Sequence, residues 1–374
     1  MAEYYTGINR RSDRKRGKRS RRSFLLFLLD CSMTVVMAVL LFCTASILIG
    51  QYISPAKMGI LSVIPLGAPV IYLLDIAVMF YWVVRWRWYR ASIMIVAVVC
   101  GSLFLSRYYK ISFDRQYDTT YNEREYSKVM TYNVLEGKKP ELLTYIEQHD
   151  PDILCVQELT PNTDNCKALA TKYKTTFDAD DKDSEVSGCQ ILSKYPILRS
   201  GAIDGLLRRN GVWADLKVAD DTVRVVNLHL QSTSIRPEDT KFIEGHEYIR
   251  DKERDSKMRS IVVRLAENNR ARAVQAESVA KFLKSSNYKV IVCGDFNDVP
   301  LSYTYNVIAD NLDDSFAKMA NGFAYTYNTK YHLLRIDNIL VSPSIEVASY
   351  DVDNKIDLSD HYPVVARVKV DVGR

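Results

Sequence analysis

The chain has 374 residues, of which 47% are hydrophobic and 25% are charged, and this composition excludes an intrinsically disordered protein. The formal net charge of +5 hides an asymmetry, because residues 1–110 hold 15 Lys and Arg against 4 Asp and Glu. Residues 111–374 hold the remaining 35 basic and 41 acidic residues, a net charge of about −6. The two parts therefore differ in the sign of their net charge and are interpreted separately.

The first part has the pattern of a membrane protein. A basic stretch, Arg10–Arg22, precedes three apolar runs at 24–50, 60–84 and 91–106. About 20 apolar residues span a bilayer, so we predict a basic cytoplasmic tail at 1–23 and about three transmembrane helices at 24–110. The alternative is a signal peptide followed by buried core helices, but no convincing small-residue cleavage site follows the first run.

The basic residues also predict the orientation of this part. Arg10–Arg22 and the cluster of Arg85, Arg87 and Arg90 are expected to stay in the cytoplasm. With three spans, everything after Lys110 then lies on the outer, extracytoplasmic side. The orientation reverses if the third run does not cross.

The second part alternates strand and helix patterns. Helices are predicted at 138–150 and 261–286, and a charged stretch without a clear pattern lies at 231–258. Strands are predicted at 128–135, 151–159, 188–197, 289–296, 335–342, 345–352 and 364–370, with a hairpin at 211–230. This mixture predicts two packed sheets with helices outside them.

Polar residues recur where these apolar strands end. Taken singly, each fits a turn or a helix cap. Together they indicate a site, because the carboxyl ends of strands are where ligands bind in layered folds. The set consists of Asn133, Glu158, His229, Asp295, Asn297, Asp337, Asp360 and His361.

The residue types indicate the chemistry of such a site. Oxygen ligands such as Glu158 and Asp360 suit Mg²⁺, whereas the set has no cysteine cluster of the kind that zinc prefers. Asp295 is suited to orienting and deprotonating a water, and Asn297 to donating to phosphoryl oxygens. Among the cysteines, Cys166 and Cys189 could pair in an oxidising compartment, but the sequence does not show whether they are close.

The order of the motifs "TYNV", "QE", "SGCQILSKYPI", "NLHL", "GDFND", "RIDNILVS" and "SDHYPV" resembles the endonuclease/exonuclease/phosphatase superfamily of DNase I-like fold, over residues 125–374. The resemblance implies a four-layer α/β sandwich as the catalytic domain at 111–374, with Mg²⁺ as cofactor and Mn²⁺ as a substitute. By position, Asn133, Glu158 and Asp360 match the metal site, and His229 matches a phosphate-contacting histidine or general acid. Asp295 and Asn297 match the pair that activates water and steadies the transition state, and Asp337 matches the acid that orients the catalytic His361.

The substrate stays open at this point. The resemblance implies a membrane-anchored, Mg²⁺-dependent phosphohydrolase that acts on phosphodiester bonds of nucleic acid or of phospholipid headgroups. The net charge of about −6 argues against tight, sequence-neutral binding of long DNA, although Arg270 and Arg272 could form a basic patch. We expect those two arginines on a solvated helix face. The alternative function is a catalytically silent member that binds a phosphorylated ligand or a partner protein at the membrane.

Overall fold

The structure is a computed structural model. It describes residues 2–110, 125–161, 163–176, 188–233, 238–239, 242, 251–329 and 332–370. The start of the predicted catalytic domain, 111–124, and half of the charged stretch 231–258 lie outside the described residues. The chain divides into two compact units. One comprises Met1–Ala45 with Val70–Gly101, and the other comprises Ser46–Pro69 with Ser102–Arg374.

The first unit is built from apolar helices. They are α1 (Ala2–Gly50), α3 (Ala68–Val84) and α4 (Trp88–Leu105). By length and composition, Phe24–Gly50 and Pro55–Val84 are long enough to cross a membrane, and Trp88–Phe104 is a shorter apolar helix. The division into a tail at 1–23 and a transmembrane region at 24–110 stays a prediction.

Acidic side chains inside the apolar helices of this unit have polar partners. Asp30 accepts hydrogen bonds from the Tyr81 hydroxyl at 2.6 Å and from Arg85 at 2.9 Å. Thr44 donates to Asp75 at 2.6 Å. Because each acid accepts a hydrogen bond from a neighbouring helix, these contacts help to fix how the helices pack.

Within the described residues, the second unit contains two six-stranded sheets and a short two-stranded one. Central strands carry continuous buried apolar runs, such as Ile153–Val156 and Val290–Cys293. The short sheet pairs β1 (Tyr109–Lys110) with β11 (Gly322–Phe323). The first large sheet has the strand order β13 (Glu346–Val352), β14 (Val364–Lys369), β2 (Ser127–Glu136), β3 (Ile153–Leu159), β5 (Gly188–Ser193) and β4 (Lys174–Thr175). The second large sheet has the strand order β10 (Asp313–Asp314), β12 (Asp337–Val341), β9 (Lys289–Asp295), β8 (Asp221–His229), β7 (Gly211–Val218) and β6 (Ile197–Ala202).

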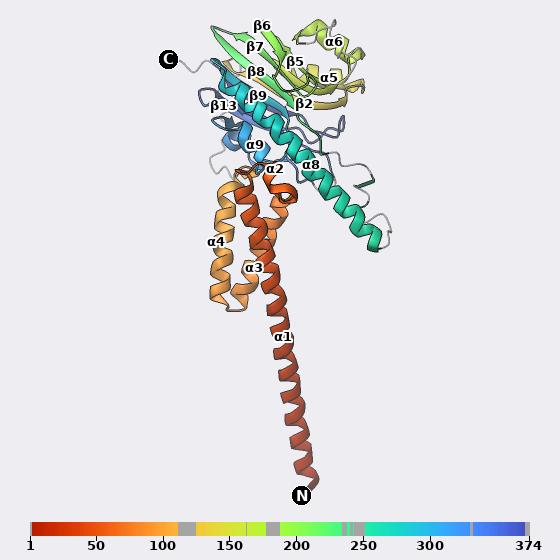
Figure 1. Cartoon of the computed structure of the whole chain (residues 1–374), viewed down its shortest axis with the longest axis vertical. Coiled ribbons are helices and arrows are strands. Elements are labelled where there is room, and N and C mark those ends of the chain that lie inside the picture. Colours follow the sequence, from red (N-terminus) through yellow and green to blue (C-terminus); the bar gives the residue numbers. More distant parts are fainter. Residues whose placement is uncertain are drawn as a thin grey trace. The chain divides into compact units, whose positions relative to one another are not determined.

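The two large sheets pack face to face and are flanked by helices (Figure 1). α5 (Glu141–His149) and α6 (Asp164–Lys172) cover the first sheet, whereas α8 (Asp251–Lys284) and α9 (Tyr303–Ile308) cover the second. The predicted four-layer α/β sandwich is therefore confirmed. Shorter helical pieces complete the unit: α2 (Pro55–Met58), the 3₁₀ segment η1 (Gly59–Gly67) and α10 (Ser315–Met319).

Two element boundaries differ from the prediction. The predicted strand 188–197 is two strands, β5 and β6, separated by a bend at 194–196. The helix predicted from 261 begins at Asp251, and its first turns are polar and mostly exposed, so they carry no apolar periodicity that the sequence could show. No disulfide joins Cys166 and Cys189, whose side chains are both buried.

Candidate active site

The sheet topology gathers the predicted residues at one edge. β2 runs parallel to β3, and β8 runs parallel to β9, so each pair presents its carboxyl ends together. In the second sheet, His229 is the register partner of Asp295 on one side and Asp337 is its partner on the other. Asp295 therefore lies between two strands that both carry site residues.

The end of β9 depends on a glycine. Gly294 has a φ of +128°, and a Cβ built on it would lie 2.0 Å from the backbone oxygen of Leu228. No other residue fits this close approach without moving the backbone. Phe296 is fully buried behind the site.

A turn brings Asn297 to the site. Asn297 lies just beyond the predicted strand 289–296, and in the structure β9 ends at Asp295 and Asn297 has a φ of +52°. Its backbone amide donates to Asp295 Oδ1 at 2.7 Å, and its side-chain amide donates to Asp295 Oδ2 and to the Leu230 carbonyl, both at 3.1 Å. A tight turn, not the pleat of a strand, positions Asn297.

One carboxylate oxygen is the meeting point of the site. Besides Asn297, three nitrogen atoms face Asp295 Oδ2: Asn133 Nδ2 at 3.3 Å, His361 Nε2 at 3.7 Å and His229 Nε2 at 3.8 Å. Asp295 is 1% exposed, so these contacts are made away from bulk water. Low local polarity strengthens each of them.

Glu158 forms the more open side of the site. Its Oε1 accepts a hydrogen bond from Asn133 Nδ2 at 3.0 Å and lies 3.4 Å from His229 Nε2. Its φ is +57°, at an irregularity where β3 changes register with both of its neighbours. A strained backbone at a strand irregularity re-aims a side chain, and such positions cluster at functional sites.

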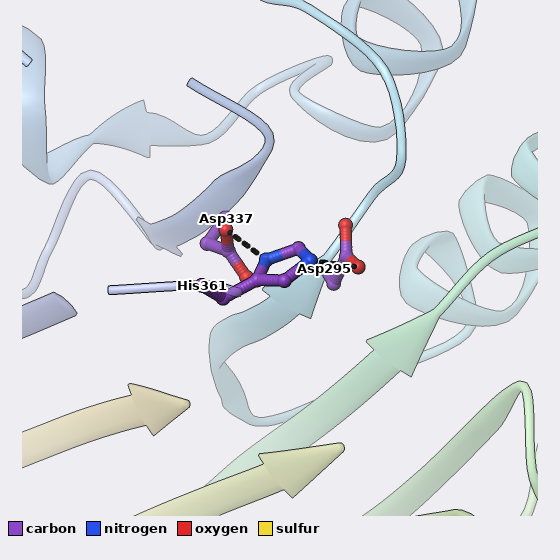
Figure 2. A group of neighbouring side chains, drawn as sticks. All are labelled: Asp295, Asp337 and His361. Carbon is purple, nitrogen blue, oxygen red and sulfur yellow. Dashed lines mark hydrogen bonds and ion pairs between the residues drawn. The ribbon is translucent and has the colours of Figure 1, made fainter. Parts of the chain in front are cut away.

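His361 is held between two acids (Figure 2). Its Nδ1 lies 2.9 Å from Asp337 Oδ2, and its Nε2 faces Asp295. Burial alone would lower the pKa of His361, but the charges of Asp337 and Asp295 outweigh it and raise that pKa to about 10. Burial raises the pKa of Asp337 to about 6, against the lowering effect of His361. The geometry favours a charged imidazolium–carboxylate pair at neutral pH.

Asp360 joins the site through a hydroxyl group. Ser359 Oγ donates to the backbone carbonyl of Asn133 at 2.7 Å and contacts Asp360 Oδ1 at 3.2 Å. Asp360 is half-buried, and its charge adds to the raised pKa of His361. The structure thus brings seven of the predicted residues into one contact network and attaches the eighth through Ser359.

The donor set fits a hard cation. Glu158 and Asp295 both direct a carboxylate oxygen at Asn133 Nδ2, so two like charges converge with one amide between them. Oxygen ligands of this kind are those that Mg²⁺ prefers. Asp295, Asp337 and His361 also offer atoms within 4.8 Å of one another. His361 Nδ1 is already engaged by Asp337, however, which favours an acid–imidazole–acid arrangement for that trio.

Two contributors to the site were not predicted. The Tyr327 ring packs against the His361 ring at 5.0 Å between centroids, from a segment without a strand pattern. Arg272 was expected on a solvated helix face, and this is wrong, because it is fully buried. The Nε atom of Arg272 lies 3.5 Å from Oδ2 of Asp298, the residue that follows Asn297. In the sequence, the second Asp of "GDFND" could have indicated this contact, because a buried acid needs a buried cation.

Comparisons with family models match two parts of the chain. The model of the Endonuclease/Exonuclease/phosphatase family matches residues 130–361, and a model described as a domain of unknown function matches residues 23–108. No curated protein matches the chain.

Several solved structures are similar to it. An endonuclease/exonuclease/phosphatase from Bacteroides vulgatus has 19% identity and a TM-score of 0.48, covering 66% of this chain and 99% of that one. A 3′ phosphatase from Neisseria bound to a product DNA hairpin has 20% identity and a TM-score of 0.46, covering 64% and 98%. An AP endonuclease from Archaeoglobus fulgidus has 17% identity and a TM-score of 0.45, covering 64% and 98%. The family match spans more than half of the chain and contains all eight predicted residues, so the chain belongs to the Endonuclease/Exonuclease/phosphatase family, whose name denotes enzymes that hydrolyse phosphate esters.

Proposed function

We propose that the chain is a membrane-anchored, metal-dependent hydrolase of phosphodiester bonds, with its catalytic domain on the outer side of the membrane. The observation that carries the proposal is the convergence of Asn133, His229, Asn297 and His361 on one buried oxygen of Asp295. A single carboxylate surrounded by donors is suited to holding one water molecule in line with a phosphorus atom.

Asp295 is the general base in this proposal. It accepts a hydrogen bond from the attacking water and takes its proton as the water oxygen adds to phosphorus. The backbone amide of Asn297 donates to Asp295, and its side-chain amide donates to Asp295 and to the Leu230 carbonyl. These contacts support a positioning role for Asn297, which holds the carboxylate at a set angle.

The two histidines face the negative charge of the substrate. His361, kept cationic by Asp337, stabilises the charge that develops on the phosphoryl oxygens. His229 lies between Glu158 and Asp295 and is 19% exposed, so it can contact substrate directly. This supports His229 as a phosphate contact or as the acid that protonates the leaving oxygen.

Glu158, Asn133 and Asp360 are the residues that would hold a divalent cation. Mg²⁺ bound there would neutralise charge on a phosphoryl oxygen and on the leaving oxygen. Mn²⁺ prefers the same oxygen donors and is expected to replace it.

The test uses the full chain in detergent with bis(p-nitrophenyl) phosphate as substrate. We expect Mg²⁺-dependent release of nitrophenol that a chelator abolishes and that Mn²⁺ restores. Asp295→Asn is expected to remove the activity, and the exposed Asp351→Asn is its matched control. Equal turnover with and without chelator would contradict the metal dependence. A folded chain without turnover on any phosphate ester would support the catalytically silent alternative.

A further inference from the structure

An apolar segment belongs to the same compact unit as the catalytic sheets. Residues 55–67 form α2 and η1, which open an apolar stretch long enough to cross a membrane, yet they group with the catalytic unit. Val63 and Leu66 pack against the buried Ile261 and Leu265 of α8. The neighbouring Ile60 is 54% exposed, so part of this apolar surface is uncovered in the catalytic unit.

The segment is tied to the rim of the active site. Asn269 of α8 is buried, and its side-chain amide donates to the carbonyl of Ser62 at 2.8 Å. The preceding residue, Asn268, donates to the carbonyl of Thr233 at 3.0 Å. Residues 230–233 directly follow His229. One turn of α8 therefore holds both the apolar segment and the loop that leaves the site.

A buried chain of contacts continues from there to the catalytic turn. Arg272 donates to Asn269 Oδ1, and it also donates to the Gln231 carbonyl at 2.8 Å. Its Nε lies 3.5 Å from Asp298, the residue after Asn297. All of these side chains are well shielded from water, so a fixed position of η1 implies a fixed position of the site.

The surface beside the segment carries charges of both signs. A Cβ built on Gly59 would lie 3.6 Å from Nη2 of Arg270, which is exposed. Arg254 and Arg259 are exposed further along α8, and so are Glu253, Asp255 and Glu267. An apolar edge bordered by charged side chains fits an element that lies at the surface of a membrane. The net charge of about −6 on residues 111–374 disfavours long nucleic acid.

We propose that the substrate is a phosphodiester of a membrane lipid and that α2 and η1 hold the active site at the bilayer surface. This inference rests on the proposed hydrolase function. Water adds its oxygen to phosphorus, and the ester P–O bond breaks with its electron pair leaving on the ester oxygen. Asp295 takes the proton of the water, and the ester oxygen receives a proton from His229 or solvent. The products are an alcohol and a phosphate monoester.

The experiment compares three substrates on the full chain reconstituted in lipid vesicles. They are phosphatidylglycerol in a phosphatidylcholine bilayer, single-stranded DNA, and soluble bis(p-nitrophenyl) phosphate. We expect the lipid to be hydrolysed about tenfold faster than DNA at equal phosphate concentration.

Variants then test the role of the segment. Ile60→Asp is expected to lower lipid hydrolysis about tenfold while leaving the soluble substrate within about twofold, because a charge disfavours interfacial burial. Leu198→Asp on β6 is the matched control, since Leu198 is 53% exposed, and it is expected to change neither rate. Melting temperatures of both variants establish that they fold.

The outcomes separate the two proposals. Hydrolysis of the soluble substrate with DNA preferred, or with the lipid untouched, overturns the lipid inference and leaves the hydrolase function standing. Equal losses on lipid and soluble substrate in Ile60→Asp also overturn it, because the segment would then be structural. Failure on all three substrates removes the hydrolase function and the inference with it.

Discussion

Asp295, Asp337 and His361 show how single residues carry the chemistry of this protein. Each is at most 5% exposed, and burying an ionisable group costs free energy unless a partner compensates. Here the compensation is mutual, because the imidazole lies between the two carboxylates. A buried, mutually compensated set of this kind perturbs pKa values where acid–base chemistry needs it.

The raised pKa of His361 predicts a pH dependence. We expect Asp337→Asn to move the alkaline limb of kcat/KM to lower pH by about one unit or more, since the variant loses the main charge that raises the pKa of His361 to about 10. The measurement is a pH–rate profile with the soluble phosphodiester, and Asp351→Asn is the exposed control. An unchanged alkaline limb would show that Asp337 does not set the protonation of His361.

The same shift has a consequence for stability. The folded-state pKa of His361 lies above the ordinary histidine pKa of 6.5, so its contribution to stability is complete below about pH 6.5 and is lost as pH rises towards 10. We expect the free energy of unfolding to fall over this window in the wild type and to fall less in His361→Gln. Denaturant titrations at pH 6.5 and 9.5 measure the difference, and equal slopes in both proteins would contradict it.

Glu158 allows a test of the metal site without loss of the fold. Its side chain is 30% exposed, so Glu158→Gln keeps the shape and removes one ligand charge. We expect turnover to fall about 100-fold or more with an unchanged melting temperature, and higher Mg²⁺ to recover part of it. Glu141→Gln, at the exposed start of α5, is the control. Full turnover of Glu158→Gln at low Mg²⁺ would remove Glu158 from the site.

At the scale of elements, two parallel strand pairs inside otherwise antiparallel sheets create the site. They bring the ends of β2 and β3 and the ends of β8 and β9 to one edge. Backbone irregularities then orient individual side chains toward the site. Glu158 has a positive φ where β3 changes register, and Asn297 has one in the turn that follows β9. Local strain thus re-aims side chains that a regular strand would direct elsewhere.

The end of β9 gives a prediction about stability. Gly294→Ala is expected to destabilise the protein by about 4 kcal/mol or more, because its Cβ would meet the Leu228 backbone at 2.0 Å. Gly322→Ala is the matched control, since Gly322 has a φ of +80° but no atom within 4 Å of the new Cβ. Its cost should be only the conformational one, about 1–2 kcal/mol. Chemical denaturation of both variants measures the difference, and similar costs would contradict the steric account.

At the scale of the whole molecule, the chain combines an apolar helical unit with a catalytic sandwich. Residues 46–69 join the second unit although they lie between apolar segments of the first. The chain therefore enters the catalytic unit twice. Under the proposed lipid chemistry, this arrangement gives the catalytic unit an apolar contact of its own with the membrane.

The predicted orientation is testable with fusions of the full chain. A reporter placed after Lys110 should report an extracytoplasmic position, and one placed at Arg87 a cytoplasmic one, because the basic clusters stay in the cytoplasm. A fusion within residues 1–23 serves as the cytoplasmic control. A cytoplasmic signal from the Lys110 fusion would mean that the apolar helix Trp88–Phe104 does not cross.

Local patterns were enough to predict much of this protein. Runs of apolar residues revealed the helices of the first part, and strands ending in Asn133, Glu158, His229 and Asp295 revealed the site edge, because both signals lie in neighbouring residues. The motif order then indicated the four-layer sandwich, which the two packed sheets confirm.

Only the tertiary structure decided which groups meet. The contact of Asn133 with Asp295 joins residues 162 positions apart, and nothing local encodes that distance. Arg272 fits a solvated helix face in the sequence, because its partners Gln231 and Asp298 lie far from it along the chain. Asn297 is positioned by a backbone of positive φ after the end of β9, which the strand pattern does not encode. Periodicity records which residues avoid water, whereas partners and exposure depend on what the rest of the chain places against each face.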